Sequence, residues 1–393
     1  MREVVIVSGV RTAIGKFGGT LKDVSDMDLG ALAIREAVKR AGITGDQVEE
    51  VIFANGYRTG ELPINSARVV AVKGGIPIEV PQFTISKACG GSLKAVTLAA
   101  QLIKSGEIDV LVSGGVESMS RAAYLLKSAR WGYRLGHGQL MDQLILFDPL
   151  SGNTMGETAE NVAKKYQITR QEQDEFALAS QQRAEAAIKG GLFKDQIVPV
   201  PIPQKKKDPL MFDTDEHPRF GTTMEMLSKL GPAFTKDKDG TVTAGNASGM
   251  NDGASALVVM SKEKAQELGK TPLATIVSYA SFGVEPSLMG IGPIPATQLA
   301  LKKAGLTMKD IDLVELNEAF ASQAVACMKE LGMEHSKVNV NGGAIALGHP
   351  VSASGGCILV KLLYEMGRRG SRYGLATMCI GGGQGIALIV ERK

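Results

Sequence analysis

The sequence predicts an α/β protein made of two copies of one strand-and-helix unit, with a long insertion in the first copy. Three observations support this prediction. A segment near the start recurs near the end, apolar strands alternate with amphipathic helices around both segments, and residues 120–248 interrupt that alternation. Such alternation is typical of sheets that are covered by helices on both faces. With 393 residues, 44% of them hydrophobic, the chain can fill a core of that size.

The repeat is clearest between residues 39–44, Lys-Arg-Ala-Gly-Ile-Thr, and residues 302–307, Lys-Lys-Ala-Gly-Leu-Thr. An acidic turn and an apolar strand follow in each copy, and we expect these strands near residues 48–53 and 311–316. Self-similarity of this kind indicates a duplicated structural unit.

Both copies continue with a strand, a glycine turn and a helix that has one apolar face. These faces consist of Leu93, Val96, Ala100 and Ile103 in the first copy, and of Ile358, Leu359, Leu362, Leu363 and Met366 in the second. Each helix leads to an apolar strand that runs into glycines, at residues 110–115 and 376–381. A buried strand at residues 251–260 is expected to complete the first copy.

The insertion contains the only tryptophan, Trp131, a proline-rich run at residues 199–203 and three lysines at 205–207. We expect helices in it at residues 159–166 and 171–189. Insertions of this length generally serve a function. The predicted division is an N-terminal core of residues 1–119 plus 249–271, an inserted loop domain of residues 120–248, and a C-terminal core of residues 272–393.

Composition excludes several classes of protein. Lys and Arg number 44 against 41 Asp and Glu, a balance that argues against a nucleic-acid partner. No apolar run approaches the roughly 18 residues of a membrane span, and no signal peptide precedes the first strand at residues 4–7. Four widely spaced cysteines without a CxxC pair predict neither a disulfide framework nor a metal site. We therefore expect a cytoplasmic protein, although a removed organellar leader would leave no trace.

Four residues carry the chemistry that the sequence predicts: Cys89, Asn317, His349 and Cys379. Each follows a predicted buried strand, and the two cysteines and His349 lie in glycine-rich turns. Cys89 precedes the first apolar helix, where the helix dipole is expected to lower the pKa of the thiol. Its alternative role is that of a buried structural cysteine. A nucleophilic thiol beside an imidazole base indicates acyl transfer through a thioester.

His349 is fixed at a turn by the following Pro350, and its alternative role is a structural one. The other histidines, His137, His217 and His335, are expected to be structural or exposed. Cys379 adds a second thiol, which is useful where a proton moves to and from a second substrate. The N–H groups near Gly381 are suited to binding an oxyanion, although glycine clusters are also common in ordinary turns.

Five motifs in this order resemble those of the thiolase family: residues 89–92, 245–249, 317–320, 342–350 and 379–385. The resemblance extends over the whole chain. It implies a duplicated thiolase fold, with a five-layered αβαβα core and an inserted loop domain. The implied activity is acyl-CoA C-acetyltransferase, which condenses two acetyl-CoA molecules to acetoacetyl-CoA or cleaves that product with coenzyme A.

The resemblance also implies roles for individual residues. Cys89 takes the acyl group and is activated by His349, while Cys379 moves the α-proton of the incoming acyl-CoA. Asn317, through a water, and His349 stabilise one oxyanion, and the amides of Cys89 and Gly381 stabilise the other. Residues expected at coenzyme A are Met155, Arg219, Ser228, Ala244, Ser248, Ala319 and Phe320. Coenzyme A and acetyl-CoA act as substrates, and no permanently bound cofactor is expected.

The resemblance further implies a homo-oligomer, a dimer or a tetramer, without a membrane partner. The apolar and aromatic residues 124–133 suit an oligomer contact. Lysines 205–207 are expected to form a solvated charge run rather than a phosphate site.

The chain departs from the family pattern at a few positions. Ser86 replaces Asn, Gly91 and Ser92 exchange the usual order, Thr154 replaces His, and Ser352 replaces Gly. The smaller Thr154 is expected to give room to the acyl group, whereas Ser352 is expected to take room away. Short acyl chains remain favoured. The alternatives are a broader-range 3-ketoacyl-CoA thiolase, a ketoacyl-acyl-carrier-protein synthase and a non-catalytic protein that binds acyl-CoA.

Overall fold

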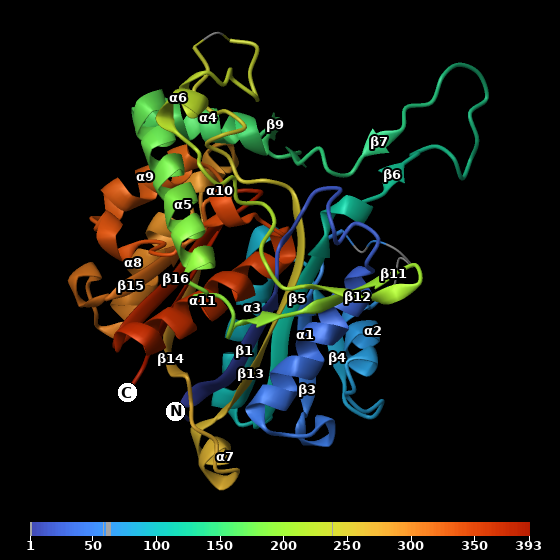
Figure 1. The fold of residues 1–393 in the computed structure, drawn as a ribbon, viewed down its shortest axis with the longest axis vertical. Coiled ribbons are helices and arrows are strands. Elements are labelled where there is room, and N and C mark those ends of the chain that lie inside the picture. Colours follow the sequence, from blue (N-terminus) through green and yellow to red (C-terminus); the bar gives the residue numbers. More distant parts are fainter. Residues whose placement is uncertain (1, 58, 60–63, 238) are drawn as a thin grey trace.

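The computed structural model describes residues 2–57, 59, 64–237 and 239–393. One mixed sheet runs through the molecule in the order β15-β16-β17-β14-β1-β13-β5-β3-β4 (Figure 1). The first copy contributes β1 (Val4–Thr12), β3 (Glu50–Ala54), β4 (Gln82–Ile85), β5 (Val110–Ser118) and β13 (Asn251–Ser261). The second copy contributes β14 (Ala274–Gly283), β15 (Leu313–Leu316), β16 (Tyr373–Ile380) and β17 (Gln384–Glu391).

The strand order confirms the predicted duplication. From its centre outward, the first copy runs β1-β13-β5-β3-β4, and the second runs β14-β17-β16-β15. A single parallel bridge between Val314 and Val338 takes the place of β4 in the second copy. The two central strands pair antiparallel, with Val5 opposite Thr275 and Ile6 opposite Ala274, so the copies share one sheet.

Helices form three layers around the two halves of this sheet, and the five-layered prediction is confirmed. The outer helices are α1 (Asp26–Ala41) and α2 (Ser66–Lys73) in the first copy, and α8 (Pro293–Ala304) and α9 (Ala321–Leu331) in the second. Between the half-sheets lie α3 (Gly91–Ser105) and α11 (Ser354–Arg369), whose predicted apolar faces meet in one core cluster. That burial is the main reason the two central helices form where they do.

The insertion separates β5 from β13, and its β10 (Ile197–Val198) pairs in parallel with β1. The second copy joins its corresponding strands by residues 381–383. The helices of the insertion are α4 (Met155–Lys165), α5 (Arg170–Lys189) and α6 (Met224–Ser228), so the first two begin at or before the predicted residues. Its short strands are β6 (Tyr124–Leu125), β7 (Met141–Asp142), β8 (Phe147–Asp148), β9 (Asn153–Thr154), β10 (Ile197–Val198), β11 (Val200–Gln204) and β12 (Lys207–Phe212). The β6–β7 hairpin projects away from the body (Figure 1).

A buried ion pair attaches the insertion to the core. Arg11 on β1 donates two hydrogen bonds to Asp215, at 2.7 and 2.8 Å, and both side chains are fully buried. Asp215 also accepts a hydrogen bond from the backbone N–H of Ile14 at 2.8 Å. The smaller elements β2 (Gly15–Lys16), α7 (Lys262–Glu267) and α10 (Ala344–Leu347) complete the fold. Among the described residues, no helix has the length and apolar character needed to cross a membrane.

Candidate active site

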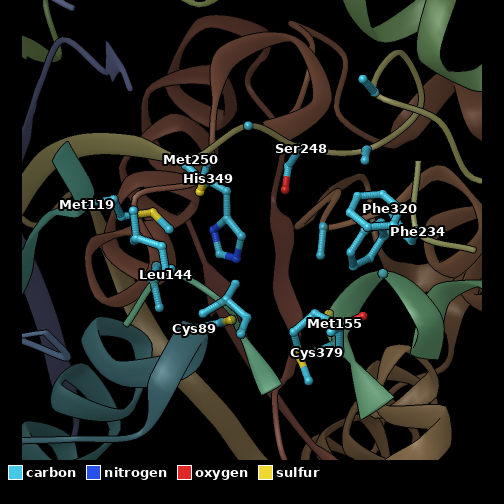
Figure 2. Close-up of a pocket in the computed structure, with 18 of the residues that line it drawn as sticks. Cys89, Met119, Leu144, Met155, Phe234, Ser248, Met250, Phe320, His349 and Cys379 are labelled. Carbon is cyan, nitrogen blue, oxygen red and sulfur yellow. The ribbon is translucent and has the colours of Figure 1, made fainter. Parts of the chain in front are cut away.

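A cavity of about 430 Å³ lies where the insertion meets the two copies. Cys89, His349 and Cys379 line it, although they come from a 3₁₀ turn, a loop and the end of β16, far apart in the chain. Figure 2 shows the ring of His349 directed toward Cys89, with Cys379 beside Met155. The structure therefore brings together the three side chains that the sequence marks as reactive.

Cys89 lies in a short 3₁₀ turn, η2 (Ala88–Gly90), directly before α3. The residue before it, Ala88, has a φ of +41°, in the left-handed region that residues other than glycine rarely adopt. Backbone strain of this kind persists only where surrounding structure enforces it, and it often accompanies functional sites. The turn leaves the Cys89 side chain half-buried, at the wall of the cavity.

The prediction that the helix start lowers the pKa of Cys89 is wrong. Burial raises its pKa to about 11, and the charge of Glu117 acts in the same direction. The N–H groups of Gly381 and of Cys89 itself donate to the sulfur and oppose this shift, but they do not outweigh the loss of solvation. Cys89 is therefore a neutral thiol at rest and needs a base to react.

His349 is positioned to serve as that base. Its Nδ1 lies 2.6 Å from Ser354 Oγ, and its Nε2 lies 3.5 Å from Asn317 Nδ2. An amide that donates to Nε2 requires the tautomer in which Nδ1 carries the proton and donates to Ser354. Burial lowers the pKa of His349 to about 4, so the ring is neutral and Nε2 is free to accept a proton.

The turn that holds His349 depends on a close packing contact. The backbone N–H of His349 donates to Asn251 Oδ1 at 2.9 Å. Gly348 has a φ of +106°, and a Cβ atom there would lie 2.5 Å from the Asn251 amide. Only glycine fits at this position without strain, which explains the glycine directly before the histidine.

Asn317 and Cys379 lie at the ends of neighbouring parallel strands, β15 and β16. The backbone N–H of Asn317 donates to Thr377 O at 3.0 Å, which continues the pairing of the two strands. Cys379 is fully buried, and its pKa is raised well above the usual value by burial, with the neighbouring Cys89 adding to the effect. Both thiols are therefore protonated at rest.

Most of the residues predicted to contact coenzyme A also line this cavity: Met155, Arg219, Ala244, Ser248, Ala319 and Phe320. The N–H of Ser248 donates to Ala319 O at 3.0 Å, which joins two of the predicted motifs. Ser228 is exposed at the end of α6 and does not line the cavity, so its role stays a prediction. In the described part of the chain, no cluster of three or more His, Cys, Asp or Glu side chains could hold a metal ion.

A second cavity of about 380 Å³ reaches Cys89 from another side. It shares Cys89, Leu146, Met155 and Val351 with the first cavity, and Gly381 belongs to its wall. Residues found only in the second cavity include Tyr57, Ser86, Phe147 and Pro149. The Cys89 sulfur thus lies at the junction of two cavities. This arrangement suits a thioester, whose acyl part and thiol part extend in different directions from the carbonyl group.

The structure corrects one expectation about the unusual residues. Ser352 lines neither cavity, because it is fully buried behind Val351, so it takes no room from the acyl group. Gly91 is tightly packed, since a Cβ atom there would lie 2.7 Å from Ala54 Cβ. Ser92 Oγ accepts a hydrogen bond from the N–H of Gly356 at 2.8 Å and so links the two central helices. Thr154 lines the first cavity and caps α4.

The sequence analysis missed three residues at the site. Ser354 fixes the tautomer of His349, and its position five residues after the histidine was the available signal. His217 was expected to be structural or exposed, yet it lines the first cavity. Glu117 is fully buried near Cys89, and a lone acid in the apolar strand β5 could have indicated it.

Comparison with known proteins agrees with this geometry. Residues 4–263 match the family model for the N-terminal domain of thiolase, and residues 270–392 match that for the C-terminal domain. An acetyl-CoA acetyltransferase of Syntrophomonas wolfei is 57% identical, with 99% of each chain covered. A beta-ketothiolase (BktB) of Cupriavidus necator is 54% identical over 100% of this chain and 99% of that protein.

A solved structure extends the comparison to three dimensions. Human mitochondrial 3-ketoacyl-CoA thiolase in complex with CoA superimposes with a TM-score of 0.96 at 45% identity. The superposition covers 100% of this chain and 98% of the human one. The family models, the relatives and the fold agree over essentially the whole chain, which belongs to the thiolase family.

Proposed function

We propose that this protein is an acyl-CoA C-acetyltransferase that condenses two acetyl-CoA molecules reversibly to acetoacetyl-CoA and coenzyme A. The observation that carries the proposal is the placement of Cys89, His349 and Cys379 around one cavity. A relative with 57% sequence identity is named acetyl-CoA acetyltransferase, which supports the same activity here.

In the first half-reaction, His349 Nε2 accepts the proton of the Cys89 thiol as the sulfur attacks the acetyl carbonyl carbon. The carbonyl oxygen gains negative charge, and the amides of Cys89 and Gly381 are suited to stabilise it. Coenzyme A then leaves and takes a proton from Cys379, which becomes a thiolate. Neutral resting thiols fit this sequence, because Cys379 must first give a proton before it can accept one.

In the second half-reaction, the Cys379 thiolate removes an α-proton from a second acetyl-CoA. The carbanion attacks the acetyl group on Cys89, and the sulfur leaves and recovers its proton from His349. Asn317 and His349 are suited to stabilise the enolate oxygen, Asn317 through a water. This shared role fits the geometry, because Nδ2 of Asn317 lies 3.5 Å from Nε2 of His349.

Coenzyme A is the expected thiol carrier, with the pantetheine arm in the first cavity beside Ser248 and Phe320. Support comes from the structure of a human relative that was solved with CoA. Residues 120–248 act in this proposal as a substrate-binding unit, between core units of residues 1–119 plus 249–271 and residues 272–393. Arg219, which lines the first cavity, and the exposed Ser228 are expected to meet the polar part of the carrier.

A broader-range degradative 3-ketoacyl-CoA thiolase is less favoured, because the acetyl-CoA acetyltransferase is 57% identical, against 54% for the beta-ketothiolase and 45% for the human 3-ketoacyl-CoA thiolase. A ketoacyl-acyl-carrier-protein synthase is disfavoured by a thiol, Cys379, at the position of the second base. A non-catalytic protein is disfavoured because Cys89, His349 and Cys379 all line one cavity.

We expect a cytoplasmic homo-oligomer, most simply a dimer or a tetramer. The β6–β7 hairpin and the loop between its strands expose large apolar side chains, among them Trp131 at 89% and Leu135 at 97%. Apolar groups in this number are typical of an interaction surface. Light scattering is expected to give a multiple of the 41.5 kDa chain mass, and a monomer at micromolar concentration would contradict this proposal.

A thiolysis assay tests the proposed function. The purified protein is mixed with acetoacetyl-CoA and free coenzyme A, and acetyl-CoA formation is followed with and without each substrate. We expect acetyl-CoA to form only when both are present. Absence of turnover in a folded oligomer would leave the non-catalytic alternative as the better description.

A further inference from the structure

Glu117 lies next to the last residue of β5 and is fully buried, with a carboxylate that accepts four hydrogen bonds. Its Oε1 accepts from the backbone N–H of Tyr57 at 3.0 Å and from Asn55 Nδ2 at 3.5 Å. Its Oε2 accepts from the backbone N–H groups of Gly56 and Ser352, both at 3.2 Å. We call this carboxylate and its four donors the Glu117 bridge.

The Glu117 bridge joins the two copies beside the nucleophile. Residues 55–57 follow β3 of the first copy, whereas Ser352 lies in the 3₁₀ turn η7 (Val351–Ala353) of the second, three residues after His349. Tyr57, a donor of the bridge, and Val351, the residue before the donor Ser352, both line the second cavity together with Cys89. One side chain therefore fixes two segments that enclose the sulfur from opposite copies.

Close packing holds the bridge in one arrangement. A Cβ atom on Gly56 would lie 2.8 Å from Glu117 Oε2 and 2.9 Å from Ser352 Oγ. On the other side, a Cβ atom on Gly115 would lie 2.4 Å from the carbonyl oxygen of Ser352. The Ser352 hydroxyl faces the carboxylate without reaching hydrogen-bond geometry, so its backbone N–H makes the link.

The charge of the bridge also acts on its neighbours. Burial raises the pKa of Glu117 to about 7, while its hydrogen bonds act in the opposite direction. The titratable groups around it are Asp26 on α1, which shares the Asn55 amide, Tyr57 on the turn and Cys89 on η2. On the neighbouring strand β13, Gly253 stands opposite Glu117 and contributes no charge.

We propose that Glu117 is a positioning residue for acyl transfer, which holds the His349 turn against Cys89 through its hydrogen bonds and places a negative charge near the thiol. The proposal rests on the proposed function, because it assumes that Cys89 accepts the acyl group. It predicts two separable effects. The hydrogen bonds of the bridge position the two segments around Cys89, and its charge acts on the Cys89 thiol.

The first variant is Glu117→Gln, which keeps the shape of the side chain but removes the charge and one of its two acceptor oxygens. We expect kcat for thiolysis to fall by about tenfold or more, the factor that a hydrogen bond to a charged group supports. The KM for coenzyme A should stay near the wild-type value. The pH profile of Cys89 alkylation by iodoacetamide should shift to lower pH, because loss of the negative charge lowers the pKa of the thiol.

Two comparison variants separate the two effects. Glu117→Asp keeps the charge on a shorter side chain, so kcat should fall while the alkylation profile stays near that of the wild type. Glu160→Gln alters a carboxylate that likewise accepts backbone N–H groups, those of Thr241 and Val242 at 2.9–3.0 Å. Because residues 241–242 lead to the Ser248 side of the cavity, this change should raise KM for coenzyme A and leave the alkylation profile unchanged.

The wild-type protein supplies a measurement that needs no variant. Below about pH 7 Glu117 becomes protonated, so the slope of log alkylation rate against pH should fall below one near that pH. The proposal is overturned if Glu117→Gln keeps wild-type kcat, if its alkylation profile does not move, or if the wild-type slope is one throughout. Alkylation reports on the thiol alone, so these outcomes remain distinct from a failure of the proposed acetyl transfer, which the thiolysis assay detects.

Discussion

The two copies of the fold differ most at two equivalent points, and those differences create the site. Before its central helix, the first copy has the turn η2 with Cys89, and the second has the turn η7 preceded by His349. Between its last two strands, the first copy inserts the segment from β5 to β13, while the second has only residues 381–383. Duplication therefore places two turns beside each other, and their divergence provides a nucleophile, a base and a substrate-binding insertion.

This comparison predicts a division of labour in which the first copy carries the acyl group and the second moves protons. The largest expected effect comes from Cys379→Ser. We expect condensation to fall by about 10²–10⁴-fold, the usual contribution of a positioned acid or base. Cys89 should still accept an acetyl group from acetyl-CoA, which mass spectrometry of the intact protein can follow.

Cys327→Ser is the matched control, because Cys327 is an equally buried thiol that lines neither cavity. It should retain most of the condensation activity. Near wild-type condensation in Cys379→Ser would remove the second copy from proton transfer and would contradict the division of labour.

Much of this architecture follows from sequence pattern alone. The repeat at residues 39–44 and 302–307, together with the two apolar helix faces, predicts both copies because burial of a face leaves a periodic signal. The order of β13 between β1 and β5 agrees with the expectation that residues 251–260 complete the first copy. Glycine-rich turns also singled out Cys89 and His349, and both line one cavity in the structure.

Other features depend on contacts that no local pattern encodes. The pKa of Cys89 is decided by burial between two copies, which reverses the effect expected from the helix start alone. Ser352 follows Val351 in sequence, but packing turns it toward Glu117 and away from both cavities. The bond between Ser354 and His349 likewise requires the turn of η7 between them.

The next effect concerns how the insertion is attached to the first copy. Asp215→Asn breaks the buried pair with Arg11 and leaves a buried guanidinium without its counter-ion. We expect a loss of about 3–5 kcal/mol in the free energy of unfolding, measured by chemical denaturation. Lys189→Gln, which breaks an exposed pair with Glu185, should cost no more than about 1 kcal/mol. If the two variants lose the same free energy of unfolding, the buried pair does not stabilise the attachment of the insertion.

The smallest effect is the preference for acyl-chain length. A methylene group in an apolar pocket is worth about 1–3 kcal/mol of discrimination, so the preference should be graded. We expect kcat/KM for acetoacetyl-CoA to exceed that for a 3-ketoacyl-CoA of six or more carbons. Because Ser352 lies outside both cavities, Thr154 is the remaining unusual residue on the wall of the first. A preference for the longer substrate would mean that the second cavity accepts the acyl chain with little restriction.

The central claim is that Cys89 carries the acyl group while the second copy supplies the proton-transfer residues. The most direct measurement is brief exposure of the protein to labelled acetyl-CoA, followed by acid quenching and peptide mapping. We predict label on the peptide that contains Cys89, and its loss in Cys89→Ala. Label on Cys379, Cys327 or Cys357 instead would contradict the account.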